Sequence, residues 1–190
     1  MNRREALSSV ALLLGGTIVG SEFFLSGCKP ERKYGESMNL TPEDLAFLDE
    51  VGETILPTTA SSPGAKAAKI GDFMKIYVSD CYEDKNQKIF LEGMKKLNEA
   101  SKAKNDKSFL DASPEQRHDL LVALDKEQKD YTSKKKDEDP AHYFRMMKEL
   151  TLFGYFTSEI GATKALRYIA VPGHYDGCVP YKKGDKAWAT

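Results

Sequence analysis

The fold of this chain is decided by residues 143–181, YFRMMKELTLFGYFTSEIGATKALRYIAVPGHYDGCVPY. The first half of this stretch predicts a helix with two adjacent apolar stripes, because apolar residues recur there at helical spacing. The stripes consist of Tyr143, Met146, Leu150 and Phe153 and of Phe144, Met147, Thr151 and Gly154. A helix that is apolar over so much of its circumference is either buried at the centre of its domain or pressed against another protein.

An extended, turn-rich arm follows this helix between residues 168 and 181. Glycine-containing dipeptides at 172–173 and 176–177 are turn signals, and aromatic and histidine rings are spread along the same segment. Such a segment makes too few repeating contacts to be stable alone, so it packs either on its own domain or on a partner protein. The candidate partner-binding residues of the helix and the arm are Tyr143, Phe144, Met147, Tyr155, Tyr168, Pro172, His174, Tyr175 and Tyr181.

The remainder of the chain predicts one helical domain. A length of 190 residues suits one domain, and 28 basic against 29 acidic residues give no positive excess of the kind that nucleic-acid binding requires. Helix starts are expected at Thr41, Asp72, Asp84 and Ser113, with Pro57 ending the first helix. Residues 57–71 form a long loop of a kind that is often functional. Because no alternating strand of useful length occurs, we predict an all-α fold of five or six helices with an irregular C-terminal arm.

Residues 1–27 predict a signal peptide, which is excluded from the fold. Arg3 and Arg4 precede an apolar run that is too short and too rich in glycine to span a membrane comfortably. The arginine pair resembles a twin-arginine signal, which exports proteins that are already folded; the alternative is an ordinary secretory signal that contains two arginines. We favour the twin-arginine route because the apolar run is only weakly hydrophobic.

The segment Leu25-Ser26-Gly27-Cys28 resembles a bacterial lipobox. In a lipobox the cysteine is acylated and becomes the new N-terminus, so we expect Cys28 to be a lipidation site and a membrane anchor. The alternative is a cysteine that happens to lie near an ordinary cleavage site. Residues 28–40 are polar and contain proline and glycine, which predicts a tether, and residues 41–190 then form the helical domain.

Two further cysteines, Cys81 and Cys178, are left once Cys28 carries lipid. In an oxidising compartment these two thiols predict one disulfide, which would close a loop of about 100 residues and tie the arm to the second helix. Two unpaired buried thiols are the alternative, and a redox or metal function has less support.

No motif in the chain predicts catalysis. His174, Asp176 and Cys178 occupy alternate positions, so on a strand they would point to one side and could bind a metal ion. The glycines around them interrupt any strand, and we therefore expect no metal site. The chain has no C-x-x-C-H for haem attachment and no G-x-S-x-G for a nucleophilic serine. We therefore assign no catalytic residue and no bound cofactor to this chain.

Two blocks of sequence resemble a known family. They are LTPEDLAFLDEVGETILPTT, residues 40–59, and FGYFTSEIGATKALRYIAVPGHYDGCVPY, residues 153–181. Both resemble the small subunit of gluconate 2-dehydrogenase, the subunit 3 family, and the resemblance extends over essentially the whole mature chain. In that family the small subunit accompanies a large FAD-containing flavoprotein of the glucose-methanol-choline oxidoreductase type, usually with a cytochrome c that carries haem c. The small subunit is not known to carry the chemistry.

The resemblance implies a non-catalytic small subunit of a membrane-tethered, FAD-dependent sugar or sugar-acid dehydrogenase. Its expected work is the export, anchoring and stabilisation of the flavoprotein subunit, and its expected location is the periplasm, with lipid on Cys28. An alternative from another class is a free-standing periplasmic helical lipoprotein that binds a small ligand or acts as a chaperone. A third reading, a thiol oxidoreductase that uses Cys81 and Cys178, has no support from the spacing of these residues.

Overall fold

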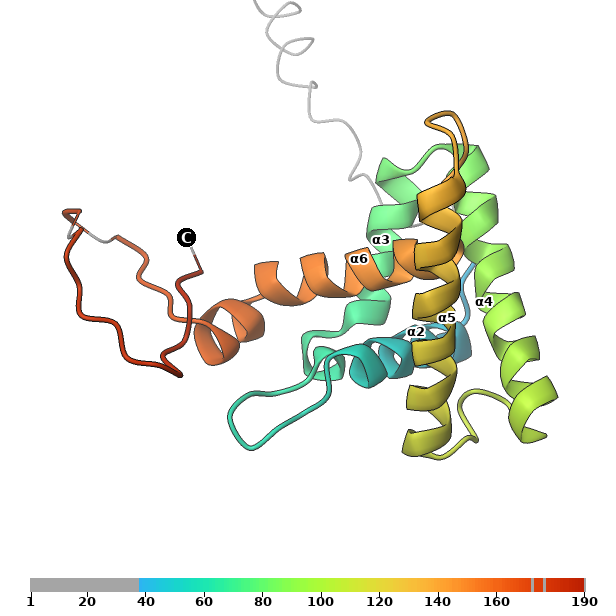
Figure 1. The fold of residues 1–190 in the computed structure, drawn as a ribbon, viewed down its shortest axis with the longest axis horizontal. Helices are drawn as coiled ribbons and strands as arrows, with labels where there is room; N and C mark the ends of the chain where they lie inside the picture. The colour runs from blue at the N-terminus through green and yellow to red at the C-terminus, as the bar shows by residue number, and fades with distance from the viewer. Residues whose placement is uncertain (1–37, 172, 176, 190) are drawn as a thin grey trace, which may run out of the picture. The chain divides into compact units, whose positions relative to one another are not determined.

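The computed structural model describes residues 38–171, 173–175 and 177–189. Over this part of the chain it contains five α-helices, two short helical turns and no strand, so the predicted all-α fold is confirmed (Figure 1). The helices are α2 (Pro42–Ile55), α3 (Ile70–Cys81), α4 (Asp84–Asn105), α5 (Pro114–Lys134) and α6 (Tyr143–Thr157), and the turns are η1 (Ala65–Ala68) and η2 (Gly161–Ala165). Nowhere in these residues does a helix have both the length and the apolar character needed to cross a membrane.

Two of the predicted helix starts are capping boxes. At the start of α2, the Asp44 amide donates to Thr41 Oγ1 over 3.2 Å, and the Thr41 amide donates to Asp44 Oδ2 over 2.9 Å. Ser113 and Gln116 exchange the same pair of hydrogen bonds at the start of α5. Each box satisfies backbone donors that the first helical turn leaves without partners, which is why both helices begin where the sequence predicts.

The start of α3 is a correction to the sequence analysis, because this helix begins at Ile70 and not after a cap at Asp72. Lys69 adopts a left-handed conformation with φ 53° and turns the chain from η1 directly into the helix. The Gly71 amide then donates to Asp49 Oδ1 over 2.8 Å, which ties the first turn of α3 to α2. The bond from α2 thus replaces the local cap that the sequence suggested.

The domain also begins earlier than predicted. Met38 is 3% exposed and belongs to the hydrophobic core, and Leu40 packs against that core. The predicted tether of residues 28–40 therefore ends too late, since Met38 and Leu40 are already part of the domain. The predicted signal peptide, residues 1–27, lies outside the described residues.

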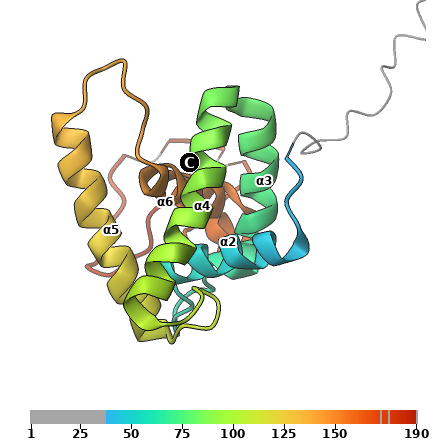
Figure 2. The same ribbon diagram turned by 90° about the vertical axis from the view of Figure 1, so that its right-hand side faces the viewer.

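Helix α6 lies at the centre of the domain. It packs against α2, α3, α4 and α5, and Figure 2 shows it nearly end-on with α5 on one side and α3 and α4 on the other. Both predicted stripes contribute to the core, since its buried residues are Phe144, Met146, Met147, Leu150, Thr151, Gly154 and Tyr155. Of the two alternatives for this helix, burial at the centre of its own domain is the one that the structure shows.

Glycines allow the neighbouring helices to approach α6 closely. A Cβ atom on Gly93 of α4 would lie 2.4 Å from Tyr143 Cβ, and one on Gly154 of α6 would lie 2.4 Å from Phe73 Cδ1 of α3. Real Cβ atoms do not approach other carbons this closely. The absence of a side chain at these two positions therefore sets the distance at which α4 and α3 pack on α6.

Candidate functional site

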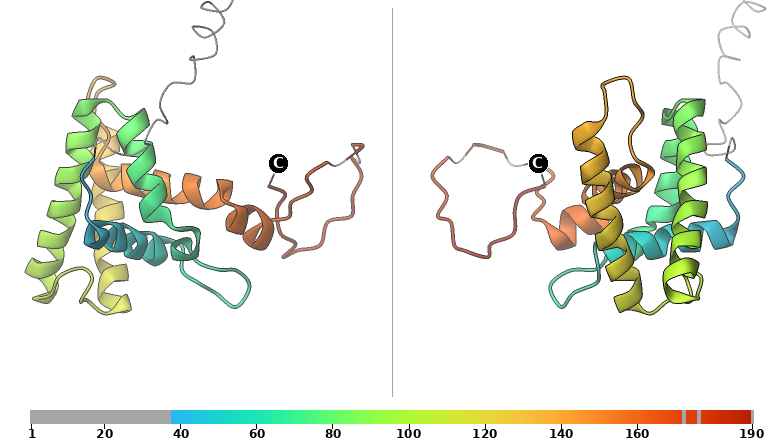
Figure 3. Two further views of the ribbon diagram at one scale, coloured as in Figure 1. Left: turned by 180° about the vertical axis from the view of Figure 1, so that it is seen from behind. Right: turned by 45° about the vertical axis from the view of Figure 1, so that its right-hand side comes forward.

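The C-terminal arm comprises residues 166–189 and follows η2 at the end of α6. Figures 1 and 3 show the arm as a wide loop beyond the C-terminal end of α6, away from α4 and α5. It is longer than the predicted arm, which stopped at Tyr181. The loop 57–64, between α2 and η1, extends to the same side of the domain in all of these views.

Large apolar side chains are exposed mainly on this side. Among the described residues, ten of the thirteen exposed large hydrophobic side chains lie at or after Leu152, in the last turns of α6 and in the arm. They are Leu152, Phe153, Phe156, Tyr168, Ile169, Val171, Tyr175, Val179, Tyr181 and Trp188. Tyr175 is 95% exposed, Val171 81% and Tyr181 79%. Single exposed hydrophobics are normal, but a concentration of them on one element marks an interaction site. We name these ten residues the C-terminal surface.

The base of the arm is closed by contacts between its two ends. The Arg167 amide donates to the Ala187 carbonyl over 2.8 Å, and the Ala189 amide donates to the Arg167 carbonyl over 2.8 Å. These bonds form an isolated parallel β-bridge between Arg167 and Trp188. The Arg167 guanidinium also lies over the Trp188 ring, 4.4 Å from its centroid. Sequence reasoning missed this closure, because Trp188 lies beyond the predicted arm and a single bridge leaves no periodic pattern.

Three side chains hold loop 57–64 next to the arm. They are the carboxylate of Glu53, the hydroxyl of Tyr155 and the ammonium group of Lys186. Glu53 accepts hydrogen bonds from the amides of Thr58, over 2.8 Å, and Lys66, over 3.0 Å. Burial alone would raise the pKa of Glu53, but these hydrogen bonds outweigh it and lower the pKa. Tyr155 Oη donates to the Pro63 carbonyl over 2.5 Å, and Lys186 Nζ contacts the Ser61 carbonyl over 3.4 Å. The loop, α6 and the arm are therefore connected.

Three predicted partner-binding residues are corrected by the structure. Phe144 is 2% exposed, Met147 0% and Tyr155 3%, so all three are core residues and are not available at a surface. The physical reason is that α6 is covered by helices of its own domain on both apolar stripes. Tyr143 is half-buried against Gly93 of α4, and burial, with the nearby Glu127 carboxylate, raises the pKa of Tyr143 to about 12.

The remaining predicted partner-binding residues lie in the arm. Tyr168, Tyr175 and Tyr181 belong to the C-terminal surface, and His174 is also exposed. Pro172 lies outside the described residues, as do the predicted export and lipidation residues Arg3, Arg4 and Cys28. The structure therefore leaves the described arm residues of the predicted set exposed and places three of the four helix residues in the core.

The predicted disulfide does not form in the structure, where Cys81 and Cys178 are free and exposed. Cys81 is the last residue of α3, and Tyr82, which follows it, lines a hollow with Met146 and Glu149 of the first half of α6, while Phe73 near the start of α3 lies against Gly154 near the end of α6. Cys178 belongs to the arm beyond the other end of α6. Disulfides require Cα atoms within about 7 Å, and the end of α3 lies toward the start of α6 while the arm lies beyond its other end.

No metal site is found among the described side chains, which contain no group of three His, Cys, Asp or Glu residues placed to hold an ion. Asp176 of the alternating pattern His174-Asp176-Cys178 lies outside the described residues. The expectation that this segment binds no metal therefore stays a prediction.

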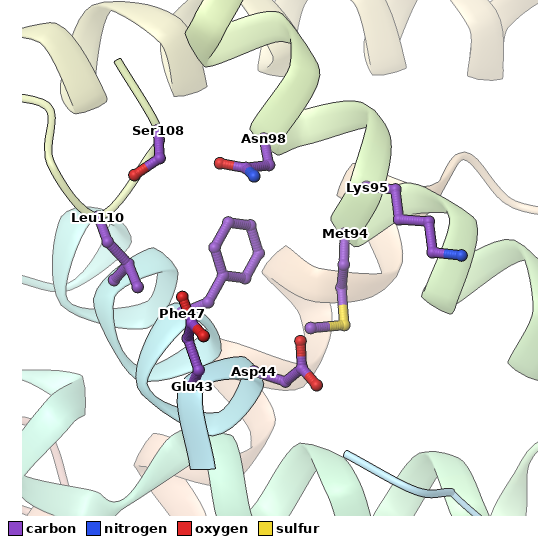
Figure 4. A pocket seen from close by; sticks show the side chains of 8 residues that line it. All are labelled: Glu43, Asp44, Phe47, Met94, Lys95, Asn98, Ser108 and Leu110. Carbon is purple, nitrogen blue, oxygen red and sulfur yellow. The ribbon is translucent and has the colours of Figure 1, made fainter. Parts of the chain in front are cut away.

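A hollow of about 160 Å³ lies between the start of α2, α4 and the connection from α4 to α5. Figure 4 shows its lining, which is apolar at Phe47, Met94 and Leu110. Most of its polar groups already serve the fold: the Asp44 carboxylate belongs to a capping box, Asn98 Oδ1 accepts from the Phe109 amide, and Ser108 Oγ donates to Asp111. The hollow therefore offers a small ligand few convergent polar groups, unlike a typical binding site.

Comparison with known proteins identifies one family. A family model described as gluconate 2-dehydrogenase subunit 3 matches residues 42–173, which is more than half of the chain. The matched range contains all five described α-helices and the first part of the arm. No curated protein and no solved structure matches the chain.

Proposed function

This chain belongs to the gluconate 2-dehydrogenase subunit 3 family, and on this premise we propose that it is the non-catalytic small subunit of a membrane-tethered, FAD-dependent dehydrogenase. The large subunit of this complex would be a flavoprotein of the glucose-methanol-choline type that holds the FAD and oxidises a sugar or sugar acid. A cytochrome c with haem c is a further expected component. In this proposal the chain itself binds no cofactor and contributes export, anchoring and stability.

The observation that carries the proposal is the concentration of exposed apolar side chains on the C-terminal surface. Tyrosine and tryptophan are enriched at the buried centres of protein interfaces, because they combine a large apolar area with a polar group. The C-terminal surface contains three tyrosines, two phenylalanines and one tryptophan. Burying such rings against a partner removes apolar area from water at about 25 cal/mol per Å². A subunit that must hold a larger partner has a physical use for this surface.

Export and anchoring are assigned to the N-terminal segment. We propose that Arg3 and Arg4 direct the chain into the twin-arginine route, which accepts folded proteins, and that the bound flavoprotein crosses the membrane with it. Lipid on Cys28 would then hold the complex at the periplasmic side of a membrane, because two or more acyl chains give stable anchoring. Anchoring is tested by Cys28→Ser, which should release the chain from the membrane fraction or leave its precursor uncleaved.

The decisive experiment joins the signal to the surface. Replacing Arg3 and Arg4 together by lysine should leave the flavoprotein in the cytoplasm, folded and with flavin bound. Truncation before residue 172 should leave this chain exported and its partner behind. Val122→Ser provides a matched control, because Val122 is 55% exposed on α5 and lies outside the C-terminal surface. Periplasmic dehydrogenase activity that survives both changes would contradict the proposal and favour a free-standing helical lipoprotein.

A further inference from the structure

The arm is a closed loop and not a free tail. Twenty residues, 168–187, lie between Arg167 and Trp188, and the β-bridge between these two residues brings the ends of the segment together. Closing a loop of this length lowers the entropy of the chain, so the closing contacts must offset that entropy. We use the name clasp for the contacts that close the arm. These are the bridge and ring contact between Arg167 and Trp188 and the contacts of the Lys186 ammonium group.

The Arg167 side chain is committed to the clasp. Its guanidinium lies over the Trp188 ring at 4.4 Å, and its Nε is buried without a hydrogen-bond partner among the described residues. A buried guanidinium nitrogen without a partner is unfavourable unless another interaction compensates for it. The face of the Trp188 indole supplies that interaction, because its π electrons attract a cation. Trp188 is 46% exposed, so one side of the ring faces the arginine and part of it faces solvent.

A tight turn directs the chain back to the clasp. The Lys182 amide donates to Asp185 Oδ2 over 3.0 Å, and the Asp185 amide donates to the Lys182 carbonyl over 3.0 Å. Gly184 lies between them with φ +95°, a backbone conformation that favours glycine. Just after this turn, Lys186 Nζ donates to the Lys164 carbonyl and contacts the Ser61 carbonyl. The clasp is therefore attached both to η2 and to loop 57–64.

We propose that Arg167 and Trp188 are positioning residues, which close the arm into a loop and so preorganise its exposed apolar side chains for docking on the flavoprotein subunit. The inference rests on the proposed function, because it names how the same surface meets its partner. An open arm would have to be ordered during binding, and ordering residues costs free energy that is subtracted from affinity. A closed arm has met part of this cost, the entropy of loop closure, before the partner arrives.

Charge indicates what kind of partner face fits this loop. Residues 164–190 contain five basic residues, Lys164, Arg167, Lys182, Lys183 and Lys186, against two acidic ones, Asp176 and Asp185. This segment is therefore positive by three charges, although the whole chain has a net charge of −1. Two copies of the arm would repel each other, which argues against self-association through it. The geometry and the charge point to an acidic rim around an apolar groove on the flavoprotein, and complex formation should weaken as salt is added.

The clasp can be followed directly, because Trp188 is the single tryptophan of the chain. In the full mature chain, Arg167→Gln should increase the quenching of tryptophan fluorescence by acrylamide and lower its anisotropy. Arg167→Lys keeps a cation over the ring and should have a smaller effect. Val122→Ser, far from the clasp in sequence, should leave the fluorescence unchanged. An unchanged signal in Arg167→Gln would overturn the clasp itself.

Its role in docking is tested by replacing the clasp with a covalent link. Strands joined by a bridge lie about 4.8 Å apart, a separation that a disulfide can span. We would combine Arg167→Cys with Trp188→Cys in a mature chain whose other cysteines are serine, and measure binding to the co-expressed flavoprotein subunit, identified by its bound flavin. We expect the oxidised form to bind about tenfold more tightly than the reduced form of the same variant, a difference of about 1.4 kcal/mol. Both forms lack the Trp188 ring, so the comparison between them measures the effect of closure alone.

Each other outcome has a defined meaning. Equal affinity of the oxidised and reduced forms, whether strong or weak, would show that closure does not matter and would overturn the positioning role. The proposed function is tested separately by Tyr175→Ser with Val179→Ser, which leave the clasp intact. If that pair keeps the flavoprotein bound, the assigned surface is wrong, whatever the fluorescence of Trp188 shows. If the mature chain whose cysteines are serine floats with anionic vesicles and does not bind the flavoprotein, the arm binds a membrane, and the inference is overturned.

Discussion

The hydroxyl of Tyr155 donates a hydrogen bond of 2.5 Å to the carbonyl oxygen of Pro63, 92 residues earlier in the chain. This bond joins the last turn of α6, from which the arm departs, to the loop between α2 and η1. Tyr155 is 3% exposed, and its neighbour Ser158 donates from its hydroxyl to the Tyr155 carbonyl over 2.7 Å. The Tyr155 bond therefore holds the C-terminal end of α6 against loop 57–64, at the point where the C-terminal surface begins.

We predict that Tyr155→Phe lowers the free energy of unfolding by about 1 kcal/mol, because it removes one hydrogen bond and leaves the Pro63 carbonyl without its donor. Urea unfolding of the mature chain measures this change. Tyr181→Phe is the matched control: Tyr181 is 79% exposed, so its hydroxyl is replaced by water contacts and stability should change by less than about 0.5 kcal/mol. Equal stability of the two variants would mean that the Tyr155 bond contributes nothing to the fold.

A second prediction concerns the glycine between α4 and α6. Gly93→Ala should lower stability by about 1–2 kcal/mol, because the new methyl group would lie 2.4 Å from Tyr143 Cβ, close to the backbone of α6 and unable to move easily. Gly52→Ala is the control, since its methyl group would meet Ala65 and Ile70 at an ordinary 3.4 Å. There the better helix propensity of alanine should raise stability, by up to about 1 kcal/mol. Thermal unfolding of both variants decides the matter, and two changes of the same sign would contradict the packing described for α6.

The parts of the fold that the sequence predicts well are those set by local chemistry. Thr41 and Ser113 cap their helices with hydrogen bonds to residues three positions later, so the information lies within four residues. The width of the apolar face of α6 predicts that this helix is covered on more than one side, and it leaves open whether its own domain or a partner covers it. These features require no knowledge of the neighbouring elements.

The parts that the sequence does not predict depend on partners distant in the chain. The start of α3 is set by Asp49 of α2, which no local signal at Asp72 reveals. The closure of the arm depends on Arg167 and Trp188 meeting across a loop. Phe144, Met147 and Tyr155 have the composition of interface residues, and only the packing of four helices around α6 shows that they belong to the core. Apolar periodicity indicates that a face is covered, and it does not indicate by what.

The third prediction concerns acid stability. Asp125 of α5 binds two lysines: Oδ2 lies 2.7 Å from Lys129 Nζ, and Oδ1 lies 2.6 Å from Lys148 Nζ of α6. The hydrogen bonds from these ammonium groups, first that of Lys129, lower the pKa of Asp125 from 3.8 to about 2. Because the pKa is lower in the folded state than in the unfolded chain, the ion pairs stabilise the fold fully above about pH 4, and this stabilisation is lost as the pH falls toward 2.

Asp125→Asn should therefore lower the free energy of unfolding by about 1 kcal/mol at pH 7, a modest value because Lys129 is largely exposed. The difference between wild type and variant should shrink between about pH 4 and about pH 2, which urea titrations at several pH values would show. Asp119→Asn is the control, since the Asp119 side chain is 73% exposed and should change stability by less than about 0.5 kcal/mol. A difference that stays constant down to pH 2 would mean that the carboxylate does not stabilise through its charge.

The last prediction distinguishes the structure from the disulfide that the cysteine count suggests. The end of α3, where Cys81 lies, is near the first half of α6, while Cys178 follows the other end of α6, and both thiols are exposed. The folded mature chain should therefore take up two alkyl groups at these residues without prior reduction, as intact mass would show, and Cys81→Ser and Cys178→Ser should each remove one. Protection of both thiols until a reductant is added would mean that the arm folds back along α6 to the end of α3. The clasp argues against that path, because it holds both ends of the arm at η2.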